Sequence, residues 1–194
     1  MAVDAFNIVM GPATLYFGAF GATEPADSAV ASPPSGAVWT DFGGTADGTD
    51  IGLEVDLTYT DLMVDQLIDS VGARLTKRLL QVSATLEEAT MQNMLAAQNQ
   101  LGTIGSGSGF ATFDPITAQS STQPTYTSLI IDGWAPTLNT GAAARRRIIV
   151  RKCLSATKLA MSFEKAKPSL FTTVWTGYYV SSTVTPYHVV DQTS

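Results

Sequence analysis

The hydrophobic pattern is most regular between residues 53 and 100, and its first part alternates strictly. A period of two predicts a strand with one wet face and one buried face. The polar positions are Glu54, Asp56, Thr58 and Thr60, and the apolar positions are Val55, Leu57 and Tyr59. Apolar residues continue to Val64, and a polar, glycine-containing segment marks a turn near 69–72. We therefore predict a hairpin with strands at 53–66 and 73–86, which are longer than the usual strand of about 5–6 residues.

The second strand of this hairpin leads into a predicted helix at about 86–101. Thr85 and Glu88 have the spacing of a capping box, in which two side chains accept hydrogen bonds from backbone N–H groups at the start of a helix. Apolar residues then recur every three or four positions, and Gly102 is placed to end the helix. The pattern predicts a single helix packed against β-structure.

The rest of the chain alternates short apolar runs with segments rich in Gly, Pro and Ser. Further strands are predicted at 13–18, 37–40, 129–134, 145–154, 158–163 and 170–180. Loop excursions are predicted at about 21–36 and 102–128, the second of which contains a Gly-Ser-Gly-Ser-Gly run at 105–109. With 194 residues and no internal repeat, we expect a single domain over 1–194 that is mainly β (α+β).

Charge is distributed unevenly along the chain, which has a net charge of −6. Eleven acidic residues precede Arg74, the first basic residue, and every other basic residue follows it. Opposite charges in different parts of a chain favour head-to-tail association of copies. The predicted contacts between subunits join Arg74, Arg145, Arg146, Arg147 and Arg151 with Asp47, Asp50, Asp61 and Asp65. Nucleic-acid binding is the alternative role for the arginine cluster, and the acidic net charge argues against it.

No pattern typical of an enzyme occurs in the sequence. His188 and Cys153 are the only histidine and cysteine, which leaves too few ligands for a typical zinc site. There is no Gly-x-Ser-x-Gly motif, and the glycines at 105–109 are not followed by the Gly-Lys-Ser/Thr of a phosphate-binding loop. Neither a secretory leader nor an apolar run of roughly 20 residues is present. We expect a non-enzymatic protein with no cofactor, no metal and no membrane insertion, made in the cytoplasm.

Several segments, taken in order, resemble the tail tube (major tail) proteins of long-tailed, non-contractile bacteriophages. The resemblance spans most of the chain and begins with the Leu-Tyr-Phe-Gly of 15–18. The other matching segments are Trp-Thr-Asp-Phe-Gly at 39–43, Asp-Gly at 47–48, Val-Asp-Gln at 64–66, Leu-Glu-Glu-Ala-Thr at 86–90, Ala-Ala-Gln-Asn at 96–99, Lys-Leu-Ala-Met-Ser-Phe at 158–163 and Phe-Thr-Thr-Val-Trp at 171–175.

This resemblance implies a β-sandwich or barrel with one flanking helix, six copies of which close into a ring. Rings would stack into a hollow tail tube, with strands at 53–66, 73–86, 145–154 and 170–180 as candidates for an inner barrel. It also implies a virion protein that is made in the host cytoplasm and sits in the tail. Its partners would be further copies of itself, a tape measure protein in the lumen and proteins at the tube ends.

In such a tube the wet face of the first long strand is the candidate channel wall. Glu54, Asp56, Thr58 and Thr60 would face the lumen, where acidic and hydroxyl side chains repel DNA phosphates or contact them only weakly. Two alternatives remain open from the sequence. One is a tube subunit of a related contractile tail or type VI secretion system. The other is a monomeric β-sandwich binding module of a carbohydrate-binding or adhesin-like kind.

Overall fold

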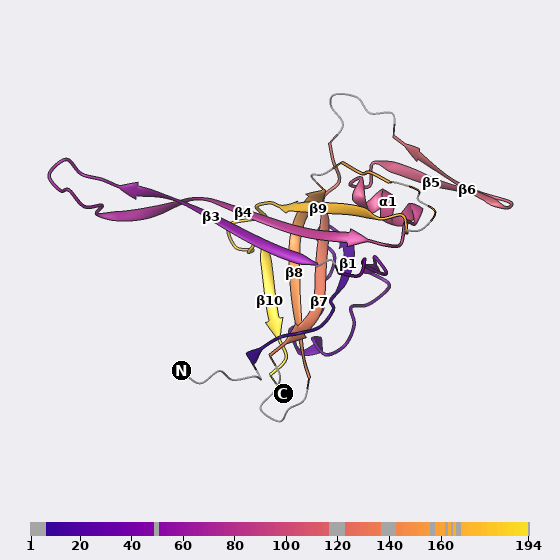
Figure 1. Cartoon of the computed structure of the whole chain (residues 1–194), viewed down its shortest axis with the longest axis horizontal. Helices are drawn as coiled ribbons and strands as arrows, with labels where there is room; N and C mark the ends of the chain where they lie inside the picture. Colours follow the sequence, from indigo (N-terminus) through magenta and orange to yellow (C-terminus); the bar gives the residue numbers. More distant parts are fainter. Residues whose placement is uncertain are drawn as a thin grey trace.

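The structure, a computed structural model, describes residues 7–48, 51–116, 123–136, 143–155, 158–161, 163, 165 and 168–193. Among these residues strands account for 48% and helices for 7%, and the strands pair antiparallel. This confirms the mainly β fold with a single flanking α-helix. Figure 1 shows a body from which one long hairpin projects.

The described strands form one large antiparallel sheet and a separate two-stranded sheet. The large sheet has the order β2-β1-β7-β8-β9-β4-β3, with β10 paired to β8. Its strands are β1 (Thr14–Ala19), β2 (Thr40–Asp41), β3 (Gly52–Leu62), β4 (Gly72–Leu86), β7 (Thr127–Ala135), β8 (Ala144–Ser155), β9 (Phe171–Gly177) and β10 (Tyr187–Asp191).

This sheet folds over on itself at the end of β8. Most of β8 pairs with β7 and β10, whereas only Cys153, Leu154 and Ser155 pair with β9. As a result β3, β4 and β9 run across β7, β8 and β10 instead of alongside them (Figure 1). The two parts of the sheet enclose the hydrophobic core in the manner of a sandwich.

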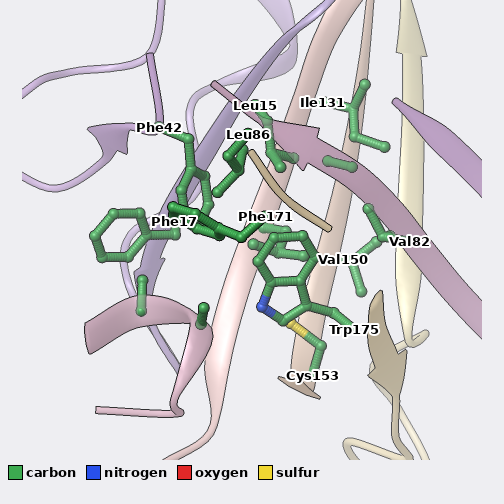
Figure 2. Close-up of a cluster of buried hydrophobic side chains, with 14 of the residues drawn as sticks. Leu15, Phe17, Phe42, Val82, Leu86, Ile131, Val150, Cys153, Phe171 and Trp175 are labelled. Atoms are coloured by element: carbon green, nitrogen blue, oxygen red, sulfur yellow. The ribbon is translucent and has the colours of Figure 1, made fainter. Parts of the chain in front are cut away.

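Side chains from both layers meet in an aromatic core (Figure 2). The rings of Phe17 and Phe42 lie 4.7 Å apart between centroids, and those of Phe42 and Trp175 lie 5.3 Å apart. The β4 layer contributes alternate residues, and Leu80, Val82, Ala84 and Leu86 are all buried. Since side chains alternate across a strand, one face of β4 closes the core and the other faces outward.

The helix is shorter than predicted and begins later. Strand β4 continues to Leu86, and α1 spans only Met91–Ala97. Thr90, and not Thr85, caps the helix, because its hydroxyl accepts a hydrogen bond from the Asn93 N–H at 3.1 Å. The predicted partner Glu88 instead accepts a hydrogen bond from the backbone of Gly44 at 2.8 Å. A tertiary contact therefore replaces the local capping box.

The end of the helix also differs from the prediction. Asn99 and Gln100 adopt positive φ angles of 56° and 59°, so the chain leaves the helix before Gly102. Gly102 is the first residue of a strand. The buried helix residues are Asn93, Ala96 and Ala97 instead of the larger apolar side chains.

The excursion predicted as a loop at 102–128 contains a β-hairpin. Strands β5 (Gly102–Gly107) and β6 (Phe110–Pro115) pair in register around a turn whose Gly109 has φ +85°. At Gly107, the exposed ring of Phe110 packs over the backbone in the space that a Cβ would occupy. The excursion at 21–36 lacks strands and holds one 3-10 turn, Asp27–Ala29. The strand predicted at 158–163 does not occur in the described residues 158–161 and 163.

Replacement of Trp175 should be strongly destabilising, because its indole is 1% exposed and contacts Phe42. We expect Trp175→Ala to lower the free energy of unfolding by about 3–5 kcal/mol. The matched control is Tyr179→Ala, since Tyr179 follows the same strand but is 71% exposed. That control should change stability by no more than about 0.5 kcal/mol. Urea unfolding followed by circular dichroism measures both, and equal losses would contradict the assignment of Trp175 to the core.

Candidate functional site

The predicted long hairpin is present, and it projects from the body. Its outer part is exposed on both faces. Strands β3 and β4 pair from Gly52–Ser83 to Leu62–Gly72, with a bulge between Thr58 and Tyr59. Every residue from 56 to 78 is exposed, and this segment is called the arm below. Figure 1 shows the arm extending well beyond the other strands.

One face of the arm is mainly apolar and continues the face of β3 and β4 that closes the core, and Arg78 lies on it opposite Leu57. Val55 lies opposite Leu80 and packs against the core. Farther out on the same face, Leu57, Tyr59 and Leu75 are 43%, 57% and 48% exposed. The sequence pattern placed Leu57 and Tyr59 in the core, and this is wrong for the single chain. The body ends before it reaches them, so no described part of the chain covers them.

The end of the arm adds further exposed apolar side chains. Met63, Leu67, Ile68 and Val71 are 62%, 56%, 98% and 59% exposed. Monomeric proteins rarely expose a contiguous apolar surface of this kind unless another molecule covers it. The arm is therefore a candidate contact surface.

The opposite face of β3, β4 and β9, outside the body, is polar. The strand register aligns Glu54 with Gln81 and Gln81 with Thr176. Four residues farther along β4, the hydroxyls of Thr85 and Thr172 lie 2.9 Å apart and share a hydrogen bond. We call this surface the polar face; its polar residues are Glu54, Gln81, Ser83, Thr85, Thr172 and Thr176, and Val174 lies among them opposite Ser83. It carries one carboxylate and no basic side chain.

All four predicted lumen residues are exposed, and the strand pairing refines their surroundings. Glu54 belongs to the polar face, and Asp56 adjoins it opposite Leu79. Thr58 lies opposite Lys77 and Thr60 lies opposite Arg74, so the outer part of this face has mixed charge. Sequence reasoning missed Gln81, Thr172 and Thr176, because their place beside Glu54 depends on pairing between distant strands.

The arginines of β8, predicted to contact other subunits, have acidic partners within the chain. Arg146 donates two hydrogen bonds of 2.6 Å to Asp191, and these lower the pKa of that carboxyl. The guanidinium of Arg151 pairs with Glu24 at 2.6 Å. Arg145 and Arg147 both pair with Asp132, at 3.3 and 3.4 Å.

Arg147 is also 1% exposed and thus inaccessible to a neighbouring copy. It donates hydrogen bonds to the carbonyls of Ala29, Val30 and Ser32, which fix the 21–36 excursion against the sheet. Strand β8 is partly buried and pairs with β7, β9 and β10, and its place in an inner barrel stays a prediction. Asp50 lies outside the described residues, and contacts made by Arg74, Asp47, Asp61 and Asp65 between subunits stay a prediction.

The sequence contains no recognised catalytic motif, and the described residues form no metal-binding cluster. No group of three His, Cys, Asp or Glu side chains is placed to hold a metal ion within that part of the chain. His188 lies 3.2 Å from Asp27 at the surface. A search of the same residues for a helix long and apolar enough to cross a membrane finds none.

No protein family model matches the chain, and no curated protein is detectably similar to it in sequence. A function is therefore inferred from these surfaces and from the order of the short motifs along the sequence.

Cys153 should be unreactive in the folded chain. Its side chain is 0% exposed, burial raises the pKa of the thiol to about 12, and the thiol donates a hydrogen bond to the Thr127 carbonyl. Only the thiolate attacks maleimides, and an unfolded cysteine ionises near pH 8.5. We expect negligible maleimide labelling of the native chain at about pH 8 and complete labelling in denaturant. Mass spectrometry measures both, and rapid labelling of the native chain would contradict this environment.

Proposed function

We propose that copies of this chain form hexameric rings that stack into the tail tube of a long-tailed, non-contractile bacteriophage, and that this tube conducts DNA during ejection. The observation that carries the proposal is the apolar face of the core that continues, uncovered, along the projecting arm. In a monomer the apolar side chains of the arm would stay in contact with water, which is unfavourable. Copies that cover one another's arms remove its apolar surface from water.

The energetics of the arm support self-association. Each large apolar side chain that becomes fully buried stabilises the assembled state by about 1.5–3 kcal/mol. The arm exposes Leu57, Tyr59 and Leu75 on one face, in addition to its tip. Strand β3 is also the end strand of the large sheet, so the hydrogen-bonding groups along its outer edge are available to another strand. Apolar contact and strand pairing can therefore act together.

The polar face supports the conduction of DNA. Passing DNA must not adhere to the wall, and neutralisation of phosphates by Lys or Arg is the main source of DNA affinity. The polar face offers hydroxyl and amide groups with one carboxylate, Glu54, and Asp56 adjoins it. Such a surface repels phosphate or binds it weakly. The protein's role is passive: it forms a wall along which the nucleic acid slides.

The proposal includes the partners and the location that the sequence resemblance implies. The chain would sit in the virion tail, after synthesis in the host cytoplasm. A tape measure protein would occupy the lumen before ejection, and tube-end proteins would contact the first and last rings. A tube of a contractile tail or a type VI secretion system would use the same surfaces, and the presence or absence of a surrounding sheath distinguishes them.

The purified chain should assemble, and the apolar face of the arm should be required. We expect rings or tubes by negative-stain microscopy for the wild type and for Thr58→Asp. Tyr59→Asp should stay folded but monomeric, because Tyr59 lies opposite Leu75 and an unpaired carboxylate buried at an interface costs several kcal/mol. The control adds the same charge to the adjacent residue, which faces the opposite side of β3. A wild-type chain that remains a 20.5 kDa monomer at high concentration would overturn the proposal and favour a monomeric binding module.

Positive charge on the polar face should make tubes retain DNA. Glu54→Lys with Asp56→Lys places two lysines per subunit beside the proposed channel, and the ring repeats them. We expect at least about tenfold more duplex DNA to co-sediment with these tubes at low salt, and most of the excess to be lost at high salt. The control, Glu87→Lys with Asp114→Lys, changes net charge equally at exposed positions elsewhere. Equal retention by both variants would show that Glu54 and Asp56 do not line the channel.

A further inference from the structure

A cluster of aromatic side chains with one lysine lies on the surface of the body. We call it the aromatic platform; it consists of Phe20, Tyr126, Lys152 and Tyr178. These residues come from segments that follow β1, precede β7, lie within β8 and follow β9. Phe20 and Tyr178 are 45% and 40% exposed, and Tyr179, the next residue in the chain, is 71% exposed. The fold thus gathers aromatic rings from three distant segments and leaves them accessible.

The platform is cationic as well as apolar. The Lys152 ammonium lies 4.3 Å from the ring centroid of Tyr126 and 5.4 Å from that of Phe20. Cation–π attraction holds the charge over the rings. The neighbouring Arg151 pairs with Glu24, so these two charges offset each other. Lys152 therefore sets the sign of the platform.

The tip of the arm, residues 61–71, has the complementary composition. It contains three carboxylates, Asp61, Asp65 and Asp69, and no basic residue. Leu67 and Ile68 stand between two of these carboxylates, and Ile68 is 98% exposed. In Figure 1 the tip extends away from the body. Its large apolar side chains are exposed in the described part of the chain.

We propose that the tip of one copy docks on the aromatic platform of a neighbouring copy. Leu67 and Ile68 would pack against the exposed rings, and the carboxylates of Asp65 and Asp69 would approach Lys152. Apolar contact supplies the affinity, and the opposite charges set the orientation. The inference rests on the proposed self-assembly and adds the surface that receives the arm. Because tip and platform are different surfaces, the contact is heterologous and repeats from copy to copy.

The other projecting element fits the tip less well. The β5–β6 hairpin exposes Phe110 to 65%. Its only charged residue is Asp114, which would repel an acidic tip. Phe110 therefore serves as a control position with comparable exposure and the wrong charge.

Site-directed crosslinking tests the docking in assembled wild-type-like tubes. A chain with Ile68→Cys and Tyr179→Cys is treated with a short bis-maleimide, while the native Cys153 is buried and does not compete. We expect a ladder of crosslinked multimers in denaturing gels. Ile68→Cys with Phe110→Cys should give no ladder. Tubes that form normally but yield no ladder from the first pair, or equal ladders from both, would overturn the docking and leave the proposed function standing.

Charge reversal gives an independent readout. Lys152→Glu in the Ile68→Cys, Tyr179→Cys chain should reduce the ladder about tenfold, because like charges across an interface are strongly unfavourable. Adding Asp69→Lys should restore it by returning the opposite-sign pair. A ladder that is insensitive to Lys152→Glu would contradict the assigned contact. If no rings or tubes form from the unmodified chain, the proposed function itself fails, and the docking fails with it.

Discussion

The alternation of β4 is the constraint on which the rest of the structure depends. Four alternate residues of its second half, from Leu80 to Leu86, are buried, and the intervening Gln81, Ser83 and Thr85 face outward. Shifting the register by one residue would exchange these sets and place polar side chains in the core. The same strand continues into the arm without interruption. The core thereby fixes which face of the hairpin is apolar and which side of β3 and β9 is polar.

Because β4 belongs to both the core and the arm, the stability of the arm and the proposed contact between copies depend on each other. The aromatic core around Phe42 and Trp175 holds the body end of the hairpin, and the arm receives no such support beyond Val55. An exposed two-stranded ribbon is only marginally stable in water. Its regular pairing therefore depends on the body at one end and, in an assembly, on the copy that covers it. Burial of a few apolar side chains then stabilises both the arm and the contact.

Local patterns in the sequence predicted the long hairpin, the single helix and the exposure of Glu54 and Asp56. They failed where distant residues decide the outcome. Glu88 has a capping spacing, but the backbone of Gly44 competes for its carboxylate. The glycine and serine residues of 102–107 are typical of loops, yet pairing with β6 makes them a strand. The partner of Arg151 is Glu24, 127 residues earlier, and no local pattern indicates such a pair.

The ion pairs within the chain stabilise the fold, whereas the charges of the arm are available for the proposed contacts between copies. On β8, Arg145, Arg146, Arg147 and Arg151 neutralise carboxylates of the same chain and hold surface segments against the sheet. The buried contacts of Arg147 are little affected by salt, because solvent ions cannot reach them. The charges of the arm lie in water and are open to screening. In the proposed assembly, ionic conditions would therefore act on the contacts between copies while the fold stays unchanged.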